Sequence, residues 1–97
     1  MKLRTLELLV SEGESDGLEF KKSTGGLKGG MESLCGFLNG RGGQMLFGVT
    51  DAGAIVGQQI SDRTLRDVAA EILHLDPPTP IEQIHIPAGR QEVLMLA

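Results

Sequence analysis

Residues 37–57 read FLNGRGGQMLFGVTDAGAIVG, and this stretch decides the fold. The segment leading into it has apolar residues at the i, i+3, i+4 and i+7 spacing of one helical face. These residues are Met31, Leu34, Cys35 and Leu38. Asn39 and Gly40 follow, and both tolerate the left-handed backbone with which many helices end. The sequence therefore predicts a helix that ends near residue 39.

The second half of the stretch predicts two strands joined by a tight turn. Gly42-Gly43 turns the chain into residues 45–49, MLFGV, which are apolar on both faces and are typical of a central strand that is covered on both sides. Residues 51–53, DAG, form a turn signal, and residues 55–57 are predicted to return antiparallel beside the central strand.

The rest of the chain predicts an α+β domain. The expected elements are a helix over 3–11, a strand over 18–22, a mobile glycine-rich loop over 23–30, a helix over 61–75 capped at Ser61-Asp62, a strand over 81–86, a turn over 87–90 and a last strand over 92–96. Together they make about three helices and about five strands in a mixed or antiparallel sheet. Residues 1–97 are expected to form one domain, and the apolar run 93–96 with no polar tail suggests a fragment of a longer multidomain protein.

Composition restricts the function classes. The net charge is -4, there is no Trp or Tyr, and Phe occurs three times. Rows of aromatic side chains for base stacking are therefore excluded, and any phosphate binding must come from a local basic patch. Cys35 is the single cysteine, and no Cys/His spacing suits structural zinc. Without a signal peptide or a long apolar run, the default expectation is a cytoplasmic protein.

Three blocks of the sequence resemble the Schlafen/AlbA-like domain. They are ESDGLEFK at 14–21, FLNGRGG at 37–43 and LFGVTDAG at 46–53. They occur in the order of the family pattern, and the resemblance spans about residues 3–75. Two positions depart from that pattern, because Thr50 stands at the first acidic position of the last block and Gly36 stands where the family has Ala.

The resemblance implies a candidate acidic site. In Schlafen members that cut tRNA or rRNA, three carboxylates form a nuclease centre with a divalent metal, and the matching positions are Glu14, Glu19 and Asp51. Such hard oxygen ligands suit Mg²⁺ or Mn²⁺, which activates water and stabilises charge on the phosphate. The alternative is structural: Glu14 caps a turn, Glu19 is a solvent-facing strand residue and Asp51 is a hairpin turn residue.

Four cations are candidate phosphate contacts: Lys21, Lys22, Lys28 and Arg41. Grouped together they would form a positive patch in an acidic protein, whereas separately they are ordinary solvated surface charges.

Three functions remain open. The favoured one is a DNA- or RNA-binding module of a bacterial-type transcriptional regulator, a family context that the resemblance implies. The second is a metal-dependent endoribonuclease that uses the three carboxylates. The third is an oligomerisation module in which residues 93–96 pair with a neighbouring chain.

Overall fold

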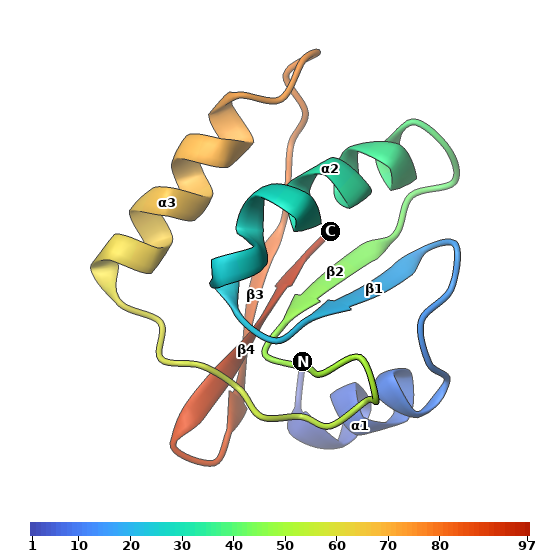
Figure 1. Ribbon diagram of the computed structural model, residues 1–97, viewed down its shortest axis with the longest axis vertical. Coiled ribbons are helices and arrows are strands. Elements are labelled where there is room, and N and C mark those ends of the chain that lie inside the picture. Colours follow the sequence, from blue (N-terminus) through green and yellow to red (C-terminus); the bar gives the residue numbers. More distant parts are fainter.

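A computed structural model describes all of residues 1–97, and its four strands form one mixed sheet with helices on both faces (Figure 1). The elements in chain order are α1 (Leu3–Ser11), β1 (Leu18–Lys21), the 3₁₀ turn η1 (Thr24–Gly26), α2 (Leu27–Leu38), β2 (Gln44–Phe47), α3 (Asp62–Leu73), β3 (Gln83–Ala88) and β4 (Gln91–Leu96). The α+β class predicted from the sequence is confirmed.

The strand order is β1-β2-β4-β3. β1 and β2 are parallel and are connected through α2, whereas β4 is antiparallel to both β2 and β3. The last strand therefore lies inside the sheet, and Val93 to Leu96 are all buried. Because β4 is paired on both sides, the expectation that residues 93–96 offer a free edge to a neighbouring chain is wrong.

Each face of the sheet has its own apolar cluster. α1 packs on one face, where its side chains join a cluster made of Leu6, Val10, Leu18, Phe20, Leu46, Val49, Ile86, Val93 and Met95. α2 and α3 lie on the other face, over a cluster made of Leu27, Met31, Leu34, Met45, Phe47, Val68, Leu75, Leu94 and Leu96. Figure 1 shows α1 separated from the other two helices by the strands. The alternation of burial along β1 follows from this arrangement, since Leu18 and Phe20 face α1 while Glu19 and Lys21 face α2.

The fifth strand expected over residues 55–57 is reduced to an isolated bridge between Val49 and Ile55. Gly48 is responsible, because its φ of +111° bends the chain directly after β2. Its carbonyl then accepts from the N–H groups of both Val56, at 2.9 Å, and Gly57, at 2.8 Å. The returning chain curls around Gly48 instead of continuing a ladder.

The loop expected over residues 23–30 is helical, since η1 and the start of α2 occupy it. Gly30 explains the difference. A Cβ at this position would lie 2.8 Å from Cζ of Phe47 and 3.1 Å from Cε of Met45. Glycine is therefore a packing requirement that lets α2 approach β2, although in the sequence it looks like a helix breaker.

The end of α2 also differs in detail from the prediction. The helix ends after Leu38, but its C-cap Asn39 has a right-handed backbone with φ of -77°. The left-handed residue is Gly42, with φ of +84°. Its N–H donates to the carbonyl of Phe37 at 2.7 Å and closes the turn.

α3 has the predicted cap but only part of the predicted burial. Ser61 and Thr64 form a capping box. Of the apolar residues in the helix only Val68 is fully buried, while Leu65 is 36% and Leu73 is 82% exposed. One flank of the apolar stripe thus faces solvent.

The β3–β4 hairpin is longer than predicted. Ala88 pairs with Gln91, so the turn consists of Gly89 and Arg90 alone and Pro87 lies within β3. Gly89 has a φ of +67°, as expected for glycine at the first central position of a type II′ hairpin turn.

Candidate nucleic-acid interface

Residues 20–31 form the most basic part of the chain and are called the lysine segment below. They contain Lys21, Lys22 and Lys28 and no acidic residue, in a protein whose net charge is -4. The segment runs from the end of β1 through η1 into α2. Local positive charge of this kind attracts an anionic ligand within about 10 Å at moderate salt, despite the negative total.

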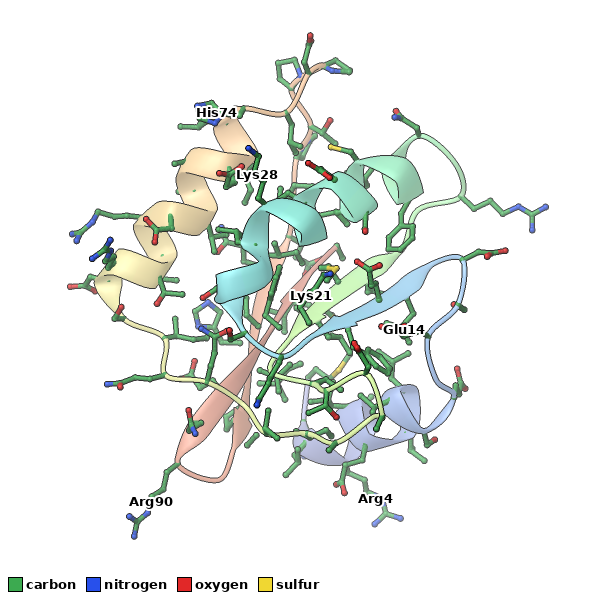
Figure 2. All side chains as sticks on the ribbon, viewed as in Figure 1. Arg4, Glu14, Lys21, Lys28, His74 and Arg90 are labelled. Carbon is green, nitrogen blue, oxygen red and sulfur yellow. The ribbon has the colours of Figure 1, made fainter.

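Lys21 is held against the start of α2. Its aliphatic part packs on Gly26, where a Cβ would lie 3.2 Å from Cδ of the lysine, and a Cβ at Gly29 would lie 3.9 Å from its Nζ. Figure 2 shows the side chain between β1 and α2. The first turn of α2 has no acidic residue, and its N-cap Gly26 supplies no side-chain cap. The positive end of the helix dipole and the ammonium group therefore act in the same place.

Lys22 is exposed directly after β1 and forms no salt bridge with a carboxylate. Its charge is free to meet a ligand. Together Lys21 and Lys22 put two positive charges at the carboxyl end of β1.

Gln58 fixes the position of the lysine segment. Its Oε1 accepts from the N–H of Thr24 at 2.7 Å, and its Nε2 donates to Oγ1 of Thr24 at 3.0 Å. The backbone of Gln58 exchanges two hydrogen bonds with Glu92 of β4. This side chain therefore anchors η1 to the sheet. The sequence carries no signal for it, because the two partners are 34 residues apart.

Lys28 and Arg41 do not join Lys21 and Lys22 in one patch. Lys28 lines a groove of about 160 Å³ between α2 and α3, where Glu32 and Glu71 also lie; Figure 2 shows it on the α3 side of α2. Arg41 lines a separate groove of about 510 Å³ between the turns that precede β1 and β2. That groove lies at the amino ends of these two strands, whereas Lys21 ends β1.

Glu14 has a definite structural contact. Its Oε1 accepts from the N–H of Phe20 at 2.9 Å, and Figure 2 shows the residue beside β1. The same turn exchanges two further backbone hydrogen bonds between Ser15 and Leu18. Glu14 thus satisfies an N–H on the outer edge of β1 that no strand covers.

Glu19 and Asp51 lie on different sides of the sheet. Glu19 is half-buried on the α2 side, in register with Met45, and its Oε2 is buried without a hydrogen-bond partner. Asp51 is exposed in the turn after β2. That turn lies on the α1 side, because a Cβ at Gly53 would be 3.6 Å from Cγ1 of Val10.

The structure does not bring the three carboxylates together. No group of three or more His, Cys, Asp or Glu side chains is placed to hold a metal ion. Thr50, at the position where the family pattern has an acid, instead accepts from the N–H of Ala54 through Oγ1 at 3.0 Å. The three carboxylates therefore do not form one common Mg²⁺ or Mn²⁺ site in this structure.

Comparison with known proteins identifies the family. The model of the family described as Schlafen, AlbA_2 matches residues 14–97. No curated protein and no solved structure matches the chain significantly. No helix has both the length and the apolar character needed to cross a membrane.

Proposed function

The chain belongs to the Schlafen, AlbA_2 family, and from this premise we propose that it is a nucleic-acid-binding module of a transcriptional regulator that contacts the phosphate backbone of DNA through its lysine segment. Family membership is compatible with a nucleic-acid-binding role. The regulator context and the choice of DNA over RNA belong to the proposal.

The observation that carries the proposal is the arrangement at the carboxyl end of β1. Lys21 packs against Gly26 at the start of α2, exposed Lys22 follows it in the chain, and α2 has no acidic residue in its first turn. Lysine side chains are common phosphate ligands, and the positive end of a helix dipole adds to their field. The anchor from Gln58 to Thr24 holds this arrangement in place before any ligand binds, so little ordering entropy is lost on binding.

The proposed contact is with the backbone and not with the bases. The protein lacks Trp and Tyr, and Phe20 of the lysine segment is buried in the core, so no aromatic side chain there is free to stack on a base. Phosphate contacts position a protein on nucleic acid without reading its sequence. We therefore expect weak, salt-dependent binding with little sequence preference, and selectivity for a site would come from other parts of a regulator.

The test is a fluorescence anisotropy titration of a labelled DNA duplex at several salt concentrations. The double variant Lys21→Gln/Lys22→Gln should weaken binding at low salt at least tenfold, and it should lower the slope of log affinity against log salt by about 0.9 for each lost phosphate contact. Arg41→Gln removes a charge at the other end of β1 and should change affinity less than twofold. The charge-matched control is the double variant Lys2→Gln/Arg4→Gln, at two exposed positions outside both regions. Equal losses in all variants would contradict a localised site.

The ribonuclease alternative is tested in the same samples. Glu19 and Asp51 lie on opposite sides of the sheet, and this separation of two of the three carboxylates favours binding without cleavage. Incubation with labelled structured RNA and Mn²⁺ should leave the RNA at full length. Cleavage by the wild type that is lost in Glu19→Ala would overturn this ranking.

A further inference from the structure

The outer edge of β3 carries unused backbone hydrogen-bonding groups. Glu82 and Ala97 exchange two backbone hydrogen bonds. Along an antiparallel ladder, hydrogen-bonded pairs of residues alternate with pairs that are not hydrogen-bonded. In the observed register Ile84 and Ile86 therefore bond to β4, whereas Gln83 and His85 point their N–H and C=O groups away from the sheet. Both residues are exposed, and no other backbone group pairs with them.

Pro87 falls on the same outward side. It follows Gln83 and His85 in the alternation, so the missing N–H of proline costs no bond to β4. Of the three residues whose backbone faces outward, only Pro87 lacks an N–H donor, while Gln83 and His85 keep theirs. No lysine or arginine occurs in β3 to repel another strand.

An exposed apolar flank of α3 lies above this edge. Glu71 and His74 line the groove toward α2, and Val68 points into the core. Helical geometry then places Leu65, Ala69 and Leu73 on the flank that faces away from α2. α2 packs on β1 and β2, and β3 is the opposite edge of the sheet. Leu73, 82% exposed, is the most exposed of the large apolar side chains.

We infer that this surface binds a second copy of the chain, with β3 of each copy paired antiparallel about a two-fold axis. A register centred on Ile84 lets Gln83 of one copy and His85 of the other exchange both backbone bonds. Because one symmetric surface supplies both sides, the interface is isologous and closes as a dimer.

The charges along the edge favour this antiparallel arrangement. Exposed Asp76 and Glu82 precede β3 in the chain, and neither Lys nor Arg occurs between Arg66 and Arg90. Arg90 projects from the hairpin tip at the other end, as Figure 2 shows. Antiparallel pairing brings the basic tip of one copy toward the acidic start of the other, whereas parallel pairing would place like charges together.

The two α3 helices would meet over the paired strands. A two-fold axis perpendicular to the sheet keeps both helices on the same face, with their exposed flanks toward each other. Neighbouring strands lie about 4.8 Å apart and packed helices about 8–10 Å apart, so the two helices pack side by side when each α3 axis lies about 4–5 Å from the two-fold axis. Leu65 and Leu73 then lose their contact with water.

The test is sedimentation equilibrium of the whole chain over a range of protein concentrations up to about 1 mM. At that concentration even a dimer with a Kd of about 1 mM is populated enough to be detected. The mean mass should rise from 10.3 kDa toward twice that value. Gln83→Pro removes an outward N–H without breaking a bond to β4, and Leu73→Glu places a charge on the α3 flank. Each should weaken the dimer at least tenfold. The matched control is Leu8→Glu, since Leu8 is 64% exposed on α1, and it should dimerise like the wild type.

A monomer at every concentration would overturn the inference, as would a dimer that both variants leave intact. Circular dichroism identifies any variant that fails to fold. If Gln83→Pro is unfolded, Leu73→Glu decides the outcome, because its side chain already faces solvent. Amide hydrogen exchange gives a second readout: the N–H groups of Gln83 and His85 should exchange more slowly as protein concentration rises, and unchanged exchange in a dimer would place the interface elsewhere.

Discussion

The two edges of the sheet end in different ways. At β1 the preceding turn folds back, Ser15 bonds to Leu18, and the Glu14 carboxylate accepts from Phe20. At β3 the outward groups of Gln83 and His85 have no partner within the chain. The difference teaches that an acidic side chain can close a strand edge, so an acidic residue in this position has a structural role whether or not it binds a metal.

The largest expected effect comes from Gly43, where the turn before β2 packs against the turn before β1 at the closed β1 edge of the sheet. A Cβ there would lie 2.5 Å from the carbonyl oxygen of Gly17 and 2.8 Å from Cδ2 of Phe37. Gly43→Ala forces the turns before β1 and β2 apart, and it should lower the free energy of unfolding by about 2–3 kcal/mol. Urea denaturation measures the change. A loss below about 0.5 kcal/mol would show that the backbone contact is not tight.

The second prediction removes the side chain that closes the β1 edge. Glu14→Ala leaves the N–H of Phe20 without its acceptor and should cost about 1–3 kcal/mol of unfolding free energy. The matched control is Glu12→Ala, because Glu12 is exposed in the preceding turn; it should change stability by less than about 0.5 kcal/mol. Equal effects of the two substitutions in denaturant titrations would remove the structural role assigned to Glu14.

The third prediction concerns Gln58, which links η1, next to the β1 edge, to β4 inside the sheet. Gln58→Ala removes both side-chain bonds to Thr24 and should cost about 0.5–1.5 kcal/mol. Amide exchange should become faster in residues 24–26, and affinity for the DNA duplex should fall because the lysine segment is less ordered. Gln59→Ala, at the exposed neighbouring position, is the control. Unchanged exchange at Thr24 would contradict the anchoring role.

The smallest prediction has the opposite sign. A Cβ at Gly36 would meet nothing within 4 Å, and the residue lies in the body of α2. Gly36→Ala should therefore raise the unfolding free energy by about 0.5–1 kcal/mol, because alanine is the better helix former. Gly30→Ala in the same helix should be destabilising, since Phe47 occupies the space. Thermal melts of the two variants that shift in the same direction would contradict this account of α2.

Much of the fold follows from local patterns. Helical spacing predicts α1 and α3, Ser61 marks the start of α3, and the apolar run 45–49 marks a central strand. The misjudged parts depend on distant partners. Gly30 belongs in a helix because of Phe47, which is 17 positions further along the chain, and the last strand is internal because it pairs with both β2 and β3.

The candidate site was predictable only as a list of residues. The sequence identifies the basic residues, but it cannot show that Lys21 packs on Gly26 while Arg41 lies at the other end of β1. It identifies the acidic residues as well, although the faces of the sheet separate Glu19 from Asp51. Gln58 has no recognisable pattern, because its role arises from a contact across the fold.

The central claim is that nucleic acid binds at the lysine segment and not at the β3 edge. The most direct measurement is a titration of the isotope-labelled protein with a short DNA duplex at low salt, followed by backbone amide chemical shifts. The account predicts progressive shifts concentrated in residues 20–31, with Gln83 and His85 unchanged at constant protein concentration. Shifts centred on Arg41 or on β3, or no shifts at all, would contradict it.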